Sequence, residues 1–333
     1  MNNRFPERLL LAALAVALLV TACSDGSESK PASTSPGDDV STSASIDPGE
    51  PQSSESASAP ESTALIVDVE LDGRRVHVTC FGPTDGTTPT VLFEAGLDEP
   101  SDTWDVVVEA LEPTRRVCSY DRAGTGASPL PPTPARTTKD IVADLEVVLE
   151  KAEIDGPFVL VGHSMAVWPL SVWAAAHPED VAAVVLVDPR GPHVSARWLA
   201  ALPPVRPHEP KAVRLNREEL TVFEHDPTQN HEHLDLGRSA AEASAVLDAP
   251  EPLFGGVPLL VLGAAETHLA WSDLPPDLAT RFGSIWVGEQ KALAAESSNG
   301  TFEKVADSGH GIEEEQPQAV IDAIESVLAD VIG

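Results

Sequence analysis

Short apolar runs recur along the chain from residue 66 onward, and they predict strands. The runs cover residues 66–70, 75–81, 90–95, 116–120, 158–162, 182–188, 259–263 and 302–306. The first two flank Asp72 and Gly73, a residue pair typical of a hairpin turn. The later runs are continuously rich in Val and Leu, as expected for strands that are buried on both faces.

Amphipathic segments separate these runs and predict helices. Residues 137–151 carry Ile141, Leu145 and Val148 at helical spacing, and residues 318–331 show the same pattern. The alternation predicts an α/β fold, in which a mostly parallel, eight-stranded sheet has helices on both faces. Residues 189–256 interrupt it with many prolines, histidines and charges and with no strand-like run, so we expect a helical lid inserted after the sixth strand.

The first 62 residues have a different composition from the rest. Arg4 and Arg8 precede an apolar run over residues 9–20 that is too short to span a bilayer comfortably, and Cys23 follows two small residues. Residues 1–22 therefore resemble the signal peptide of a bacterial lipoprotein, in which the cysteine thiol receives diacylglycerol. An ordinary secretory signal that happens to carry a cysteine is the alternative interpretation.

The segment after Cys23 predicts a tether. Residues 24–62 contain 13 Ser, 5 Pro, eight acidic residues and one Lys, and no aromatic residue. Such a segment cannot bury enough apolar surface to offset the entropy lost on ordering. We expect residues 23–62 to be a disordered link between a membrane lipid and a domain at 63–333, and the protein to be exported and anchored in the cell envelope.

Charge narrows the range of partners. The net charge is −32, and residues 63–333 carry −26 of it. A surface of this sign argues against nucleic acid and against direct adhesion of the folded domain to anionic lipid. We expect a monomer that acts on a small molecule.

A lone serine stands where the run at 158–162 gives way to a helical pattern. The sequence there is Gly162, His163, Ser164, Met165 and Ala166, which fits the nucleophile elbow Gly-x-Ser-x-Gly with alanine in the last place. The turn is so tight that its flanking residues must be small. The N–H of Met165 would point outward and could stabilise an oxyanion. A plain helix N-cap serine is the alternative.

A nucleophilic serine needs a base, and His310 has the right place for one. It follows the last strand-like run and precedes the last helix, within Ser-Gly-His-Gly. Three other histidines, His225, His231 and His233, cluster in the insertion. Metal ligation by them is conceivable, but a solvated lid segment is the simpler interpretation, and the sequence predicts neither a metal site nor a cofactor.

Together these motifs make residues 66–333 resemble the alpha/beta-hydrolase superfamily. Residues 92–97, Leu-Phe-Glu-Ala-Gly-Leu, resemble the loop that supplies the second oxyanion donor, which implies the N–H of Leu97. Residues 120–128 match the superfamily's Tyr-Asp-Arg-x-Gly-x-Gly-x-Ser signature, in which Arg122 is expected to pair with a nearby group. The resemblance implies a Ser-His-acid triad and no cofactor.

Two residues compete for the role of the triad acid. In the resembled fold the acid follows the sixth or the seventh strand, which leaves Asp188 or Glu266, with Asp273 more distant. We favour Asp188, because it stands at a strand tip where the backbone is most rigid. The predicted activity is cleavage of carboxylic esters through an acyl-enzyme. An amidase, peptidase, thioesterase or lactonase, or a catalytically silent lipoprotein that binds a ligand, remain as alternatives.

Two cysteines remain after lipidation of Cys23, and an exported domain favours a disulfide between them. Cys80 ends the second strand-like run and Cys118 lies in the fourth. In the resembled fold these strands are antiparallel neighbours, which implies that the two cysteines lie within bridging distance. Two separate buried thiols are the alternative.

Overall fold

The computed structural model describes residues 63–84, 86, 88–132, 135–266 and 271–333. In this part of the chain, eight strands form one sheet in the order β1-β2-β4-β3-β5-β6-β7-β8. The strands are β1 (Leu65–Leu71), β2 (Arg74–Phe81), β3 (Thr90–Glu94), β4 (Val117–Tyr120), β5 (Phe158–His163), β6 (Val181–Val187), β7 (Leu259–Ala264) and β8 (Gly300–Val305). Strand β2 runs antiparallel to β1 and β4, and the other neighbours are parallel. The predicted α/β fold with a mostly parallel sheet is confirmed.

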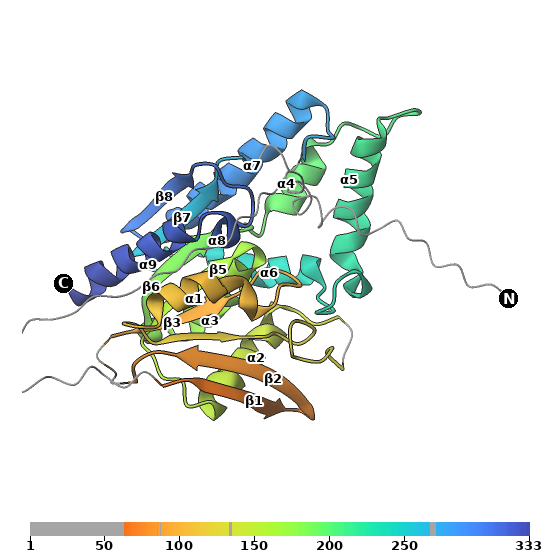
Figure 1. Cartoon of the computed structure of the whole chain (residues 1–333). Helices are drawn as coiled ribbons and strands as arrows, with labels where there is room; N and C mark the ends of the chain where they lie inside the picture. Colours follow the sequence, from red (N-terminus) through yellow and green to blue (C-terminus); the bar gives the residue numbers. More distant parts are fainter. Residues whose placement is uncertain (1–62, 85, 87, 133–134, 267–270) are drawn as a thin grey trace, which may run out of the picture. The chain divides into compact units, whose positions relative to one another are not determined.

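Helices cover both faces of this sheet (Figure 1). The helices are α1 (Asp105–Leu111), α2 (Thr138–Lys151), α3 (Val167–Ala176), α4 (Val194–Ala201), α5 (Lys211–Val222), α6 (Leu236–Leu247), α7 (Pro276–Ala294), α8 (Ile312–Glu315) and α9 (Pro317–Ile332). Successive residues of the central strands point to opposite faces, so Leu92 enters the core under α2, α3 and α6, whereas Val91 and Phe93 enter the core under α1 and α9. Two apolar cores explain why these strands are hydrophobic at every position.

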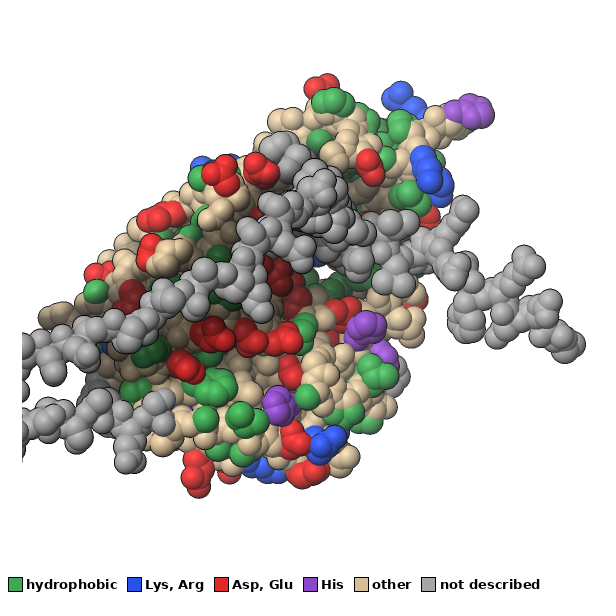
Figure 2. Space-filling model, viewed as in Figure 1, with side chains coloured by type: hydrophobic (Ala, Val, Ile, Leu, Met, Phe, Trp, Pro, Cys, Tyr) green, Lys and Arg blue, Asp and Glu red, His purple; other side chains and the backbone are tan. Residues whose placement is uncertain are grey.

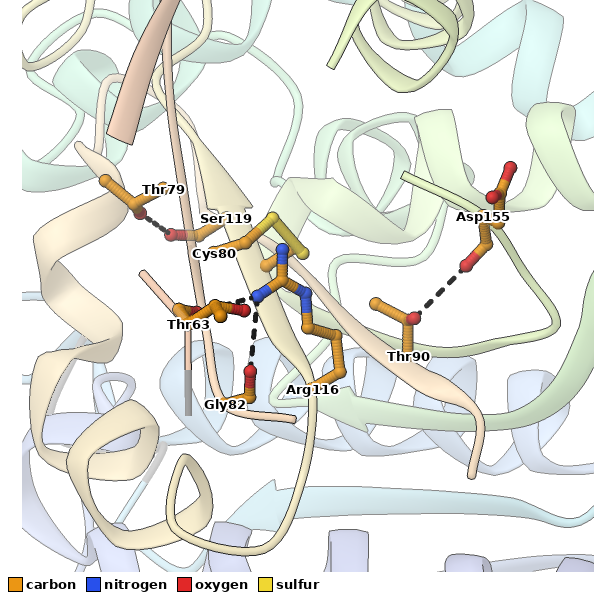
Figure 3. Close-up of a disulfide and its surroundings, with 9 residues drawn as sticks. Thr63, Thr79, Cys80, Gly82, Thr90, Arg116, Ser119 and Asp155 are labelled. Atoms are coloured by element: carbon orange, nitrogen blue, oxygen red, sulfur yellow. Dashed lines mark hydrogen bonds between the residues drawn. A yellow bond between two sulfur atoms is a disulfide. The ribbon is translucent and has the colours of Figure 1, made fainter. Parts of the chain in front are cut away.

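The edge formed by β1, β2 and β4 carries a tight turn and a covalent link. Asp72 and Gly73 join β1 to β2 with φ angles of 51° and 79°, the left-handed pair that a two-residue hairpin requires. Cys80 and Cys118 are register partners in β2 and β4, their Cα atoms are 4.1 Å apart, and they form a disulfide (Figure 3). The disulfide prediction is confirmed.

The insertion after β6 divides into two parts. Helices α4 and α5 pack with the first half of α7 around their own apolar cluster, in which Trp198 lies between Phe282 and Trp286. Helix α6 instead packs on α2 and α3, and its buried leucines belong to the main core. The interpretation of the whole range 189–256 as a lid is therefore too broad: only α4 and α5 form a separate cap, because α6 shares the core of the sheet.

The N-terminal predictions concern residues outside the described part. The signal peptide at 1–22, Cys23 and the tether at 23–62 all lie there. Among the residues that are described, no helix combines the length and the apolar composition needed to cross a bilayer. Acidic side chains outnumber basic ones on the face shown in Figure 2, in keeping with the net charge of −32.

Candidate active site

Ser164 lies at the turn that connects β5 to α3. A single 3-10 turn, Ser164–Ala166, joins the two elements, and Ser164 has a φ angle of 53°. This left-handed conformation is costly for a residue with a side chain, and it typically persists where a site uses it. A Cβ atom on Gly162 would lie 2.6 Å from Leu170 Cδ1 and 3.0 Å from Ala166 Cβ. The turn therefore requires small residues at these places, as the sequence motif predicts.

His310 lies on the loop between β8 and α8, next to this turn. Its Nε2 atom is 2.9 Å from Ser164 Oγ, and its Nδ1 atom is 2.6 Å from Asp188 Oδ2. The His310 side chain is 46% exposed, while that of Asp188 is fully buried. The three residues that the sequence singled out thus form one continuous chain of hydrogen bonds, from the serine hydroxyl to the carboxylate.

Asp188 follows β6 directly and is held by several donors. Its Oδ1 atom accepts hydrogen bonds from the backbone N–H of Ala264, from Trp286 Nε1 and from Gln290 Nε2, at 3.0, 3.1 and 2.6 Å. Trp286 and Gln290 lie one turn apart on α7 and reach Asp188 from the same side. Although burial opposes ionisation, the hydrogen bond and charge of His310 and the bonds from Ala264 and Gln290 keep the pKa of Asp188 below its usual value.

The competing acids lie elsewhere. Glu266 is exposed, and its backbone N–H donates to the carbonyl of Ser308, so this residue supports the loop of His310 through its main chain. Asp273 is also exposed. Only Asp188, of the three candidates, makes a side-chain hydrogen bond to His310 in the structure.

The two predicted oxyanion donors come from neighbouring strands. Met165 follows the serine directly. Leu97 lies on the loop after β3, and β3 pairs with β5 through Glu94 and Gly162 at this end. A Cβ atom on Gly96 would lie 2.9 Å from His163 Nδ1, which shows how closely the loop passes the elbow. The backbone of Gly96 therefore lies beside the turn that carries Ser164.

Arg122 fixes the backbone of that loop. It is buried after β4 and uses all of its donors. Its Nη1 atom donates to Glu94 and to the carbonyl of Ala95, its Nη2 atom donates to the carbonyl of Gly96 and to Glu232, and its Nε atom donates to Glu232. Glu94 also accepts a hydrogen bond of 2.6 Å from Tyr120. The prediction that Arg122 pairs nearby is confirmed, and its partners include the loop that carries Leu97.

Glu232 brings the end of the insertion to the same loop. It is fully buried, and besides Arg122 it accepts a hydrogen bond from the N–H of Asp98 at 2.8 Å. In return, Asp98 accepts from the N–H of His231 at 2.7 Å. The sequence patterns did not identify Glu94 or Glu232 as members of the site. A charge inside the apolar run at 90–95 is a signal for a buried pair, but nothing near Glu232 in the sequence identifies its partner.

Behind the elbow lies a second ionic group, which the sequence did not predict; His163 and Glu313 are buried, and Glu99 is partly exposed. The Nδ1 atom of His163 is 2.8 Å from Glu99 Oε2 and 3.1 Å from Glu313 Oε1. These are also the three residues, within the described ranges, whose ligand atoms lie within 4.8 Å of one another and could hold a metal ion. His225, His231 and His233 do not form such a group there. His163 is buried, as its place in the elbow suggests.

Comparison with known proteins agrees with this architecture. Residues 89–245 match the family model for the alpha/beta hydrolase fold. A thermophilic esterase from Thermogutta terrifontis superimposes with a TM-score of 0.56 and 22% identity, over 81% of this chain and all of that one. The sheet order and the matched model give the folded domain the alpha/beta hydrolase fold.

Relatives by sequence cover the chain unevenly. It is 39% identical over 124 residues to a protein named as a probable transporter, efuK, of Hormonema carpetanum, but spans only 18% of that protein. It is 25% identical over 258 residues to the uncharacterized protein YqjL of Bacillus subtilis, which is 77% of this chain and 89% of the relative.

Proposed function

We propose that the domain is a serine hydrolase that cleaves carboxylic esters through a covalent acyl-enzyme. The observation that supports this most directly is the chain of contacts from Ser164 Oγ to His310 and on to Asp188, at 2.9 and 2.6 Å. A serine in a strained turn, a partly exposed imidazole and a buried carboxylate are the three groups that acyl transfer by a triad needs. The esterase from Thermogutta terrifontis has the same fold, which is consistent with such chemistry.

In the proposed reaction, His310 Nε2 takes the proton from Ser164 as the serine oxygen attacks the ester carbonyl. The N–H groups of Met165 and Leu97 stabilise the oxyanion, and one such donor lowers the activation barrier by roughly 2.7–4 kcal/mol. His310 then gives its proton to the departing alcohol. Water then enters, and its oxygen attacks the acyl carbon while His310 Nε2 takes one of its protons. The bond between the acyl carbon and Ser164 Oγ breaks, His310 returns the proton to Oγ, and the acid leaves.

Asp188 would hold His310 in the tautomer that places the proton on Nδ1, and it would stabilise the imidazolium that forms. Its Oδ1 atom is occupied by three N–H donors, so Oδ2 alone faces the histidine. The carboxylate therefore cannot rotate away without breaking several hydrogen bonds.

A labelling experiment tests the nucleophile. We expect a fluorophosphonate probe to modify wild-type protein at Ser164, and Ser164→Ala to block the modification. A panel of ester, thioester, lactone and peptide substrates then identifies the leaving group. Ser164→Ala and His310→Ala should each lower kcat for the best substrate by about 10⁴-fold or more, and the double variant should lose little beyond either one, because the members of a triad act as a unit. Near-wild-type turnover by Ser164→Ala would end the proposal.

We also propose that the protein is exported and anchored to a membrane at the cell envelope through Cys23. The disulfide between Cys80 and Cys118 supports export, because such bonds persist in oxidising compartments. Wild-type protein made in a bacterium that processes lipoproteins should partition into detergent, while Cys23→Ala should stay in the aqueous phase. Equal partition of the two proteins would contradict the anchor.

A further inference from the structure

His163 lies at the point where three functional loops meet. Its side chain is 1% exposed. Its Nε2 atom is 3.0 Å from the carbonyl oxygen of His310, so it donates a hydrogen bond to the main chain of the proposed base. On the other side, Nδ1 faces carboxylate oxygens of Glu99, which follows the loop of Leu97, and of Glu313, which lies on α8 three residues after His310.

These contacts define the protonation state of the ring. Because Nε2 donates to a carbonyl, it carries a proton. An unprotonated Nδ1 would turn its lone pair toward two carboxylate oxygens at 2.8 and 3.1 Å, and these are distances of direct hydrogen bonds. When both carboxylates are ionised, Nδ1 therefore carries a proton as well, and the ring is an imidazolium. Although burial opposes this charge, the carboxylates of Glu313 and Glu99 raise the pKa of His163 to about 10.

Glu99 connects the same ring to the oxyanion loop. Its Oε2 atom also accepts a hydrogen bond from the N–H of Gly96 at 2.8 Å. Burial by itself would raise the pKa of Glu99, but the charge and hydrogen bond of His163 and the N–H of Gly96 lower it to about 2. One carboxylate thus holds both the residue before Leu97 and the residue before Ser164.

We propose that His163 is a positioning residue, an imidazolium that fixes the loop of His310 and, through Glu99, the oxyanion loop relative to Ser164. The inference rests on the proposed hydrolase function and deepens it. His163 itself touches neither the substrate nor the reacting atoms in this mechanism. It acts through the carbonyl of His310 and the N–H of Gly96.

The presence of two carboxylates has an electrostatic reason. The rings of His163 and His310 have centroids 4.6 Å apart, and His310 gains a positive charge during the reaction. A lone cation at that distance would oppose this change. Glu99 and Glu313 offset the charge of His163, so the ring can orient the base without repelling the charge that develops on it.

The first experiment measures the charge of the ring. Nitrogen NMR of histidine-labelled domain at pH 8, assigned by comparison with His163→Gln, should show one buried ring protonated at both nitrogens. Elemental analysis of the same sample should find no stoichiometric metal. A neutral ring would overturn the proposal. A bound divalent ion would also overturn it, because Glu99, His163 and Glu313 would then be metal ligands.

The second experiment measures positioning. We expect His163→Phe to lower kcat by about 100-fold and to leave KM within about threefold, since a displaced base costs rate more than binding. His163→Gln, which keeps an N–H donor, should restore part of the loss. His77→Gln serves as the matched control, because His77 makes a similar contact with a carboxylate, Asp68, at the surface.

Fluorophosphonate labelling separates the two possible failures. If wild-type protein is not labelled, the proposed function fails. If wild-type and His163→Phe proteins are labelled at equal rates, only the positioning role fails. Should His163→Phe not fold, the NMR measurement and the kinetics of His163→Gln still decide the question, and wild-type kcat for His163→Gln together with a neutral ring in the wild-type protein would refute it.

Discussion

Two buried carboxylates stand at the carboxyl ends of strands on either side of the elbow, and their surroundings differ. Glu94 ends β3 and faces Arg122, whereas Asp188 follows β6 and faces His310. Burial raises the pKa of Glu94 in spite of Arg122, and the additional charge of Glu232 acts in the same direction. Hydrogen bonds from His310 and other donors hold the pKa of Asp188 below its usual value against the effect of burial.

The two carboxylates therefore have different roles, one in holding the backbone in place and one in the proposed reaction. The partner of Glu94 is a permanent cation with every donor in use, so this side of the elbow holds backbone in place. The partner of Asp188 is the imidazole of the proposed base, so this side takes part in the proposed reaction. The fold therefore uses the same kind of buried charge once to fix the loop that follows β3 and once to hold the proposed base.

The largest expected effect is on turnover, on the side of Asp188. Asp188→Asn should lower kcat by about 10⁴-fold, because the amide would hold His310 in the wrong tautomer. Glu266→Gln, the control, should keep most of the activity, since its side chain is exposed. Both proteins should unfold in urea within about 1.5 kcal/mol of wild type. The opposite ranking of the two variants would assign the acid to the loop after β7.

The next largest expected effect is on the free energy of unfolding, through the buried ion pairs of Arg122 with Glu94 and Glu232. Arg122→Met should lower the free energy of unfolding by about 3–5 kcal/mol, because it leaves two buried carboxylates without their cation. Arg75→Met removes an exposed ion pair with Asp68 and should cost at most about 1 kcal/mol. Urea unfolding measures both changes. A cost for Arg122→Met as small as that of the control would refute the scaffold role.

A smaller effect concerns a third carboxylate, Glu313, and its dependence on pH. Burial raises its pKa from 4.5 to about 7, although His163 lowers it. The folded state thus binds this proton more tightly than the unfolded state. Protonated Glu313 therefore stabilises the folded state by about 3 kcal/mol below pH 4.5, and this stabilisation is lost as the pH rises to about 7. Unfolding of wild type and Glu313→Gln across this range should show a difference that changes with pH, and a constant difference would contradict the assignment.

Local patterns in the sequence identified the residues of the proposed triad better than the residues that hold them in place. Ser164 and Asp188 each stand just after a buried strand, and strands of this kind are recognisable from their apolar runs. His310 instead follows β8, a strand at the edge of the sheet that is largely exposed. Parallel strands bring these ends to one edge of the sheet, so the three residues could be grouped before any coordinates were known. The hairpin at Asp72 and Gly73 was predictable for a similar reason, since its turn chemistry is local.

The residues that hold the proposed triad and its loops in place make contacts with residues that are distant in the sequence. Glu232 reaches Arg122 across 110 positions, and His163 reaches the carbonyl of His310 across 147. No periodicity encodes such pairs, because the segment around one partner does not identify the other. The boundary of the lid failed for the same reason: the pattern of α6 is amphipathic whether it covers a cap or the main core, and only the packing on α2 and α3 distinguishes the two.

The aromatic cluster of the cap has a consequence for building chimeras. Trp198 of α4 stacks on Phe282 and donates its indole N–H to the carbonyl of that residue, so the core of the cap is completed by the first half of α7. The same helix carries Trp286 and Gln290 to Asp188. If residues 194–222 alone were replaced by the cap of another hydrolase, the new cap would pack against Phe282 and Trp286 of this protein, to which its own side chains are not matched. A graft should therefore exchange residues 194–222 and the apolar positions of α7 before Trp286 as one unit, and retain the host's residues 230–247 and 286–294.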